Sequence, residues 1–180
     1  MTNLKVKPFD IKYIKYLNKI YTTSFSKEKR FSFIMLLFNT IRKKSEIFML
    51  LENETLVSFL YAINYKNSSF ILYLAVESNK RNKGYGSYLL NWYCRKKINN
   101  NIYLNIDEVD DCFSNNSIRK KRLQFYLSNK FYDTTYISVE KDGNFNILSS
   151  NKNFNLEEYI ELDKKISIWF LSKKSIIVKK

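Results

Sequence analysis

The sequence contains no histidine, three glycines, one proline and two cysteines. The lack of histidine excludes every mechanism that needs an imidazole base, including the Ser-His and Cys-His pairs of covalent catalysis. The two cysteines, Cys94 and Cys112, are too few for a structural zinc site and do not form a framework of spaced pairs. We therefore expect no bound metal and two free, reduced thiols.

Long apolar runs are also missing. No run approaches the roughly 18 residues of a membrane span, and the N-terminal segment MTNLKVKPFD lacks the apolar core of a signal peptide. We expect a cytoplasmic protein that does not bind membranes. An apolar fraction of 45% and an aromatic fraction of 17% indicate a globular chain. Its length favours one domain over residues 1–180, with residues 150–180 forming a C-terminal helix and a tail.

The net charge of +14 raises the hypothesis of a nucleic-acid partner. Lysine, however, far outnumbers arginine, and asparagine, isoleucine and tyrosine are abundant too, a bias typical of translated AT-rich DNA. The lysines are scattered through all segments without one dense patch. We expect no dedicated nucleic-acid function, and we keep a basic nucleic-acid-binding module as a competing hypothesis.

Hydrophobic periodicity predicts the element order β-α-α-β-β-β-α-β-α-β-β, an α/β (α+β) fold with a central mixed sheet. Strands are expected at residues 4–9, 46–52, 55–65, 69–77, 101–109, 131–141 and 144–150. Helices are expected at residues 10–24, 27–44, 84–97, 117–129 and 156–166. Ser26 is the expected cap of the second helix. Helical spacing predicts that the first two helices bury Ile11, Ile14, Leu17, Ile20 and Tyr21, and Phe31, Ile34, Met35, Phe38 and Ile41.

Two of the glycines lie on either side of Tyr85 in the stretch ESNKRNKGYGSYLLNWY, directly after the apolar run FILYLAV. Such glycines can simply relieve crowding where a strand meets a helix. They can also let consecutive backbone N–H groups converge on a phosphate at a helix N-terminus, with Arg81 and Lys83 adding charge at the rim. The stretch is neither a Walker loop nor a dinucleotide fingerprint, because the Gly-Lys-Ser/Thr and the third glycine are missing.

Arg81-Asn82-Lys83-Gly84-Tyr85-Gly86, after a strand that ends in Ala75-Val76, resembles the R/Q-x-x-G-x-G/A signature of the GNAT superfamily. These proteins are acetyl-CoA-dependent N-acetyltransferases. The predicted element order is similar to the GNAT fold over nearly the whole chain. The resemblance therefore implies the acyl-CoA N-acyltransferase fold and an acetyl-CoA cofactor.

Two further segments are similar to family patterns. RLQFYLSNKFYDT resembles a Y-x-x-x-G-F segment, with Tyr126 and Phe131 in place and Lys130 at the glycine position. The turn after that helix must therefore adopt another conformation or accept strain. SFSKEKRFSF resembles the F-P-x-x-E-R-x-P-F segment of one bacterial branch, with serine at both proline positions and Lys29 at the glutamate position.

The resemblance implies that the coenzyme diphosphate lies on the N–H groups of residues 81–87. It also implies that the pantetheine arm follows the edge of the strand at residues 70–77, which separates from the next parallel strand. The implied cofactor-binding residues are Leu74, Ala75, Val76, Arg81, Asn82, Lys83, Gly84, Tyr85, Gly86, Ser87, Asn116 and Tyr126, with Asn115 as a further pantetheine contact.

Acetyl transfer to an amine requires a base for the amine, a donor for the developing oxyanion and an acid for the departing thiolate. The resemblance implies that the N–H of Val76 is the oxyanion donor. Tyr126 is the candidate acid, since a phenol can hydrogen-bond a sulfur and return a proton to it. The alternative for Tyr126 is ordinary packing, because it shares one helical face with Leu123 and Leu127.

The candidate base lies in IDEVDD, the densest acidic cluster of this basic chain, at the end of a predicted central strand. Asp107 and Glu108 point to opposite faces by alternation, so only one can serve. We prefer Asp107, which aligns with a family carboxylate. Asp110 and Asp111 read almost equally well as a solvated acidic loop, and Glu28 on the early helix is a third candidate carboxylate.

The leading hypothesis is transfer of an acetyl group from acetyl-CoA to the primary amine of a small molecule or peptide, by direct attack and without an acyl-enzyme. A non-catalytic acyl-CoA-binding sensor of the same fold is the alternative. The sequence leaves open which amine is the acceptor. It also leaves open whether the tail ISIWFLSKKSIIVKK packs on the domain or forms a homodimer contact.

Overall fold

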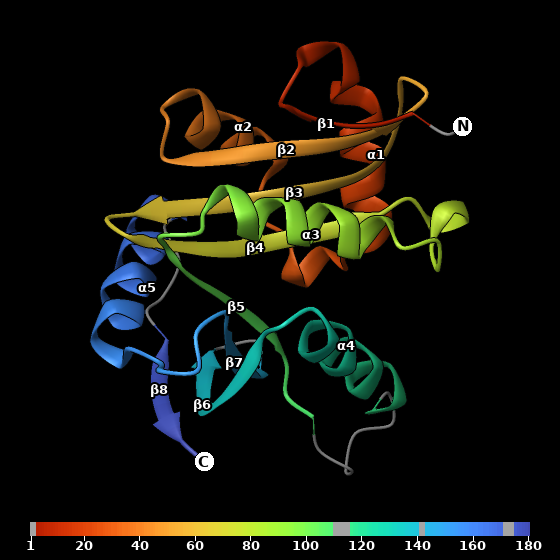
Figure 1. Ribbon diagram of the computed structural model, residues 1–180. Helices are drawn as coiled ribbons and strands as arrows, with labels where there is room; N and C mark the ends of the chain where they lie inside the picture. Colours follow the sequence, from red (N-terminus) through yellow and green to blue (C-terminus); the bar gives the residue numbers. More distant parts are fainter. Residues whose placement is uncertain (1–2, 110–115, 141–142, 171–174) are drawn as a thin grey trace. The chain divides into compact units, whose positions relative to one another are not determined.

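The computed structural model describes residues 3–109, 116–140, 143–170 and 175–180. Its strands form an eight-stranded sheet in the order β1-β2-β3-β4-β5-β7-β6-β8 (Figure 1), which confirms the predicted mixed α/β fold. The chain divides into two compact units. We call them the N-terminal unit (residues 1–64 and 71–96) and the C-terminal unit (residues 65–70 and 97–180). The expected single domain stays a prediction.

The N-terminal unit contains the first strands and helices. Its strands are β1 (Leu4–Pro8), β2 (Ser45–Glu52), β3 (Thr55–Tyr65) and most of β4 (Ser68–Val76). Its helices are α1 (Ile14–Ser24), α2 (Phe33–Ile41) and α3 (Tyr85–Lys96), with 3-10 turns η1 (Ile11–Tyr13), η2 (Lys27–Lys29) and η3 (Ser78–Lys80). Strands β1 and β3 both pair antiparallel with β2. These strands and α3 match the predicted segments closely.

Helices cover both faces of the sheet in this unit. The ring of Trp92 on α3 contacts Phe48 of β2, with centroids 4.9 Å apart. The ring of Tyr21 on α1 contacts Phe59 of β3 at 6.3 Å. Phe59 pairs with Met49, the strand neighbour of Phe48, and neighbouring residues point to opposite faces. The core of the unit therefore lies in two layers, one under α3 and one under α1.

The predicted second helix is divided in two. Tyr73 of β4 accepts a hydrogen bond from the N–H of Phe31 at 3.1 Å and donates one to the carbonyl of Lys29 at 3.1 Å. Backbone groups that bond a tyrosine hydroxyl cannot also form the hydrogen bonds of a continuous helix. The 3-10 turn η2 therefore ends at Lys29, and α2 begins after Ser32 and not after Ser26.

The predicted buried face of α2 is also wrong. Ile34, Phe38 and Ile41 are 79%, 52% and 76% exposed, and Leu36 is buried instead. The helix is apolar nearly all round, so periodicity alone cannot choose its buried face. Ile11, assigned to the buried face of the first helix, is 72% exposed in η1.

The C-terminal unit contains the remaining elements. They are β5 (Asn101–Asp107), β6 (Tyr132–Glu140), β7 (Gly143–Ser149), β8 (Ile176–Lys179), α4 (Asn116–Ser128) and α5 (Leu156–Phe170). The first residues of β4 pair in parallel with β5, and β7 is antiparallel to both β5 and β6. Helix α5 continues past its predicted end. The tail then adds β8, which no pattern predicted, along β6 of its own chain.

Tyrosine side chains join α5 to the sheet of this unit. The rings of Tyr159 on α5 and Tyr103 on β5 meet edge to face, with centroids 5.6 Å apart. The hydroxyl of Tyr159 donates to Oδ1 of Asn105 at 3.0 Å, and the hydroxyl of Tyr103 donates to Glu158 at 2.9 Å. This contact closes the core of the C-terminal unit beneath β5.

Candidate functional site

The glycine loop lies between η3 and α3. Asn82 and Gly84 both have left-handed backbone conformations, with φ of 62° and 80°. The first hydrogen bond of the helix runs from the N–H of Tyr88 to the carbonyl of Gly84 at 2.9 Å. Among the described residues, no acceptor bonds the N–H groups at positions 82–86. Consecutive donors at the positive end of a helix form an arrangement suited to an anion.

The space around this loop is open. A Cβ built on Gly84 would have no protein atom within 4 Å. Arg81, Asn82 and Lys83 are exposed, while Tyr85 turns into the core. An anionic group can therefore approach the backbone at Gly84, and the exposed basic side chains of Arg81 and Lys83 belong to the same loop.

A glutamate behind the loop holds it in place. Glu52, the last residue of β2, accepts hydrogen bonds from the hydroxyl of Tyr85 and from Nζ of Lys80, the latter at 2.7 Å. The bond from Lys80 is the main reason that the pKa of Glu52 lies below its usual value, and the bond to Glu52 raises the pKa of Tyr85. Both ends of the loop are thus tied to one carboxylate. This anchor could not be predicted from the sequence, since no local pattern links positions so far apart.

The end of β4 presents two backbone donors on one side. The N–H of Glu77 donates to a carbonyl of β3 at 2.9 Å, and the carbonyl of Ala75 accepts from the hydroxyl of Ser58 at 2.8 Å. Backbone N–H groups alternate in direction along a strand. Those of Leu74 and Val76 therefore point away from β3.

Tyr126 lies on α4 in the C-terminal unit and is 9% exposed. Its ring packs against Phe125 and Phe131, with centroids 5.0 and 5.8 Å away. Burial raises the pKa of Tyr126 to about 12, so the phenol is protonated at neutral pH. Its hydroxyl donates no hydrogen bond to any residue that the structure describes. The ring of Tyr126 thus packs in the core, while its hydroxyl proton remains available for a hydrogen bond to a ligand.

The turn after α4 shows how the chain accommodates lysine in place of glycine. Lys130 adopts a left-handed conformation with φ of 67°. The N–H groups of Lys130 and Phe131 donate to the carbonyls of Leu127 and Tyr126, each at 3.1 Å. Of the two expected outcomes, strain is the one found, because the turn keeps the conformation that glycine favours.

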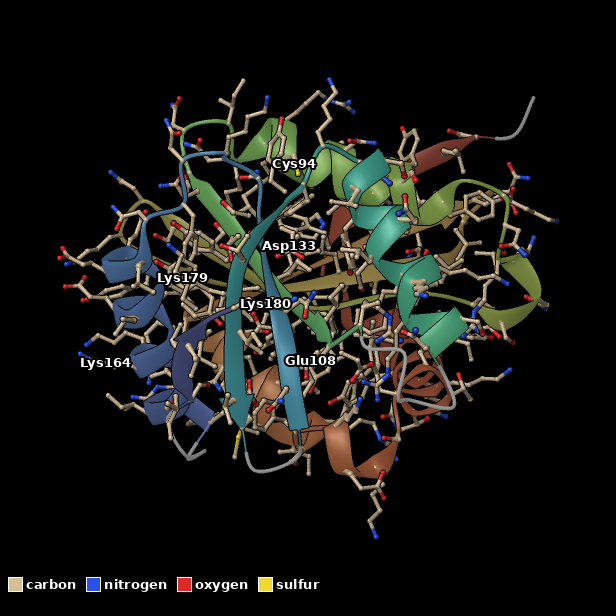
Figure 2. The ribbon with its side chains drawn as sticks, turned by 90° about the horizontal axis from the view of Figure 1, so that it is seen from below. Cys94, Glu108, Asp133, Lys164, Lys179 and Lys180 are labelled. Carbon is tan, nitrogen blue, oxygen red and sulfur yellow. The ribbon has the colours of Figure 1, made fainter. Side chains whose placement is uncertain are left out.

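The two candidate bases at the end of β5 have different partners. Asp107 forms an ion pair with Arg122 of α4, at 2.8 Å from Nη1 to Oδ2. Oε2 of Glu108 accepts a hydrogen bond from Nδ2 of Asn144 on β7 at 3.0 Å, and its backbone carbonyl accepts one from Arg119 at 2.8 Å. Figure 2 shows Glu108 beside β7. A cation thus stabilises the charge of Asp107, whereas the recorded side-chain partner of Glu108 is neutral.

The remaining candidates are scattered. Glu28 lies exposed in η2, and its pKa is lowered chiefly by a hydrogen bond from its own backbone N–H, then by the hydroxyl of Ser26. Asn116 is buried in the first turn of α4. Asp110, Asp111, Cys112 and Asn115 lie outside the described residues. Cys94 is half-buried, and burial raises the pKa of its thiol to about 11.

The structure groups the predicted site residues by unit. The N-terminal unit contains residues 74–76, residues 81–87 and Glu28. The C-terminal unit contains Asp107, Glu108, Asn116 and Tyr126. Across the described parts of the chain, no three histidine, cysteine or acidic side chains gather closely enough to hold a metal ion. No helix in those parts has the length and apolar character for a membrane crossing.

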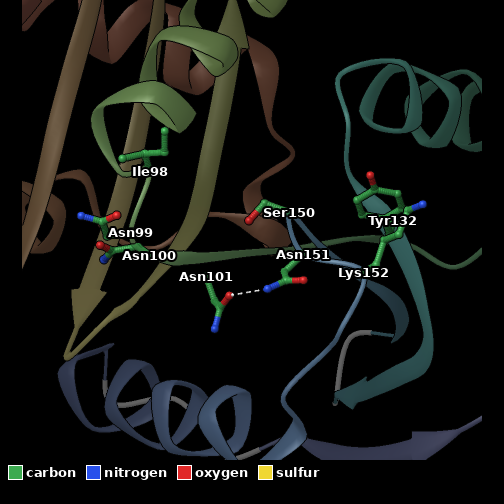
Figure 3. Close-up of a pocket in the computed structure, with 8 residues that line it drawn as sticks. All are labelled: Ile98, Asn99, Asn100, Asn101, Tyr132, Ser150, Asn151 and Lys152. Atoms are coloured by element: carbon green, nitrogen blue, oxygen red, sulfur yellow. Dashed lines mark hydrogen bonds between the residues drawn. The ribbon is translucent and has the colours of Figure 1, made fainter.

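A pocket of about 480 Å³ lies elsewhere in the C-terminal unit (Figure 3). Its lining is mostly amide and hydroxyl groups, from Ile98, Asn99, Asn100, Asn101, Tyr132, Ser150, Asn151 and Lys152. Asn101 begins β5, whereas Asp107 ends it, which places them roughly 20 Å apart along the strand. The pocket is therefore separate from the candidate bases.

Comparison with known proteins identifies the family. The model of the acetyltransferase (GNAT) family matches residues 13–143. The chain belongs to this GNAT family. The glycine loop and β4 lie within the matched region, as do α4 and the candidate bases at the end of β5. Functionally characterised protein sequences yield no match.

Solved structures show the same fold at low identity. A GNAT-family protein from Bacteroides thetaiotaomicron has a TM-score of 0.73 and 19% identity, covering 94% of this chain and 99% of its own. An aminoglycoside 6'-N-acetyltransferase complexed with coenzyme A has a TM-score of 0.66 and 16% identity, covering 81% and 95%. PaiA N-acetyltransferase from Thermoplasma acidophilum, also in complex with coenzyme A, has a TM-score of 0.58 and 16% identity, covering 82% and 98%.

Proposed function

We propose that this GNAT protein transfers an acetyl group from acetyl-CoA to a primary amine by direct attack. The observation that carries the proposal is the row of N–H groups at positions 82–86, which no described residue bonds, at the start of α3. A row of that kind suits a diphosphate, the group that anchors coenzyme A. Membership of an acetyltransferase family supports the same chemistry.

The N-terminal unit supplies a fitting cradle for the coenzyme. The amides of residues 81–87 would hold the diphosphate, and the exposed Arg81 and Lys83 would add charge. The open space beside Gly84 leaves room for it. Bound acetyl-CoA supplies an acyl group activated as a thioester. Two relatives of the same fold, the aminoglycoside and PaiA acetyltransferases, were solved with coenzyme A.

The proposed roles of Leu74 and Val76 follow from the direction of β4. Because their N–H groups point away from β3, they are available to a ligand along that side of the strand. We assign the pantetheine contacts to this segment, Ala75 included, and the donor for the developing oxyanion to the N–H of Val76. A fixed backbone donor of this kind needs no reorganisation during the reaction.

Among the carboxylates, the contacts favour Glu108 as the proton acceptor over Asp107, the residue that the sequence favours. The arginine partner of Asp107 stabilises its ionised form and makes it a weaker base. Glu28 is disfavoured because its pKa is lowered by bonds within its own turn. Glu108 would take the proton of the incoming ammonium, directly or through water. Asp107 would contribute negative charge that attracts that ammonium.

Tyr126 is assigned the hydrogen bond to the departing sulfur. Its phenol is protonated at neutral pH and its hydroxyl has no acceptor among the described residues. Asn116, buried in the same helix, is assigned a second contact to the pantetheine arm.

The direct test is acetyl-CoA-dependent release of thiol across a panel of polyamines, aminoglycosides, amino acids and short peptides. We expect turnover with at least one class, and we expect Tyr126→Phe to lose most of the kcat while its Kd for coenzyme A stays unchanged. Coenzyme binding without turnover on any amine would instead favour the sensor. Steeply salt-dependent DNA or RNA binding that ignores coenzyme A would favour the nucleic-acid module.

A further inference from the structure

Arg30 stands out in the N-terminal unit as a half-buried cation without a counter-ion among the described residues. It follows η2 and is half-buried. Its Nε is buried and has no hydrogen-bond partner. Its guanidinium forms no hydrogen bond or ion pair with any residue that the structure describes. Burying part of a guanidinium without a hydrogen-bond acceptor is unfavourable, so we expect this side chain to receive an anion at its accessible end.

The chain holds Arg30 in place from both sides. The hydroxyl of Tyr73 bonds the carbonyl of Lys29 and the N–H of Phe31, each at 3.1 Å. The hydroxyl of Tyr21 donates to the carbonyl of Phe31 at 2.9 Å. The guanidinium carbon itself lies 6.0 Å from the centre of the Tyr21 ring. Two buried tyrosines thus fix the peptide on each side of one arginine, which is the rigidity expected of a binding residue.

No neighbouring group neutralises this arginine. Burial raises the pKa of both Tyr21 and Tyr73, so their hydroxyls stay uncharged. Glu28 feels the charge of Arg30, but its carboxylate bonds the backbone of its own turn. The Nη atoms of Arg30 are not buried and reach solvent. A planar carboxylate can therefore bond the accessible end of the guanidinium with two parallel hydrogen bonds.

The position of Arg30 relates it to the proposed acyl-transfer site. Tyr73, which holds its flanking peptides, lies on β4, the strand that ends at Val76. Tyr73 lies three residues before Val76, which is about 10 Å along the strand. We propose that Arg30 binds a carboxylate of the acceptor, so that the acceptor is an amine that also carries a carboxylate, as a short peptide does. This proposal rests on the acetyl transfer proposed above.

Matched acceptors test it. Trialanine carries an N-terminal amine and a C-terminal carboxylate, and its C-terminal amide differs only in that charge. With the parent protein, we expect kcat/KM for trialanine to exceed that for the amide by about tenfold to hundredfold, mostly through KM, as for a charge-assisted bond. In Arg30→Gln the two peptides should react alike. Arg30→Lys should recover only part of the difference, because an ammonium lacks the planar fork.

Arg42→Gln is the matched control. Arg42 is exposed in the same unit and stacks on Phe38 at 5.1 Å, so its replacement removes the same charge from a stacked arginine. We expect this variant to keep the preference for trialanine. Thermal unfolding of Arg30→Gln shows whether the variant is folded before its kinetics are compared.

The possible outcomes distinguish a failure of the carboxylate contact at Arg30 from a failure of the proposed acetyl transfer. No thiol release with any amine would refute the acetyl transfer. Calorimetric titration of the protein–coenzyme A complex with both peptides would then still judge Arg30 by binding alone. Equal use of trialanine and its amide by the parent protein, or an unchanged preference in Arg30→Gln, would overturn the role of Arg30. Faster turnover of polyamines than of any carboxylate-bearing amine would do the same.

Discussion

Replacement of Gly84 by valine separates the coenzyme cradle from the stability of the fold. Gly84 has φ of 80°, a conformation that costs an L-residue about 1–2 kcal/mol. A Cβ at this position meets no protein atom within 4 Å, so we add no steric term. For a chain of this size, each kcal/mol lowers the Tm by about 2–4 °C. We therefore expect a folded variant whose Tm is lower by roughly 2–8 °C.

The effect on coenzyme affinity should be much larger. The added side chain occupies the open space beside the free amides, or else turns the loop out of its left-handed conformation. Either change removes hydrogen bonds from the diphosphate, each contributing about 1.5–3 kcal/mol when the acceptor is charged. Loss of two such bonds weakens binding by roughly 100-fold to 20,000-fold. Isothermal titration with coenzyme A measures this directly.

Gly143 provides the control. It is also left-handed, with φ of 135°, and a Cβ there also meets nothing within 4 Å, but it begins β7 in the C-terminal unit. Gly143→Val should lose comparable stability and keep its affinity for coenzyme A. A folded Gly84→Val variant that binds coenzyme A within about threefold of the parent would refute the cradle.

Three further predictions concern other parts of the chain. Glu108→Gln should lower kcat by about 100-fold or more at neutral pH. Asp107→Asn should mainly raise KM for the amine. If steady-state kinetics showed the reverse, with the large loss of kcat in Asp107→Asn, Asp107 would be the base. The lowered pKa of Glu52 means that its ionised form stabilises the fold above the usual pKa of 4.5 and that this contribution is lost as the pH falls below that value. Thermal melts between pH 6 and 3 should therefore show an acid loss that Glu52→Gln largely lacks. Lys130→Gly should raise the Tm by about 2–4 °C, since it removes about 1 kcal/mol of left-handed strain, and an unchanged or lower Tm would mean that the turn is not strained.

Much of the fold could be predicted because its signals are local. Strands β2 to β4 are long apolar runs bounded by turn residues, and α3 begins directly after Gly84. The interruption before α2 could not be predicted in this way. It depends on the hydroxyl of Tyr73, a residue 42 positions beyond Phe31, which takes the hydrogen bond that a helix would have made. Strand β8 is short and mostly exposed, so its pattern resembles that of a mobile tail.

The candidate site likewise has parts that local sequence predicts and parts that depend on distant contacts. The loop at residues 81–87 could be found because its glycines and basic residues are contiguous in the sequence. Its anchor, Glu52, could not, because a carboxylate at the end of an apolar strand carries no sign of its distant partners. Arg30 was missed for a related reason. A lysine-rich segment gives no hint that its arginine is half-buried with an unbonded Nε, and only the tertiary structure reveals this.

The pKa of Tyr126 limits what its hydroxyl can do as an acid. A phenol with a pKa of about 12 is weaker than a thiol of about 8.5 by roughly 3.5 units, which is about 5 kcal/mol against full proton transfer to the thiolate. Tyr126 can therefore act as a hydrogen-bond donor to the sulfur, and as a proton donor only if another proton reaches it in the same step. The newly acylated amine carries a surplus proton that can fill this need. The phenol then stays protonated up to about pH 12. Deprotonation of Tyr126 should therefore cause no fall in the kcat of the parent protein near pH 9–10. Any fall there should persist in Tyr126→Phe. A fall that Tyr126→Phe abolishes would mean that the bound state lowers this pKa and that the phenol releases its proton outright.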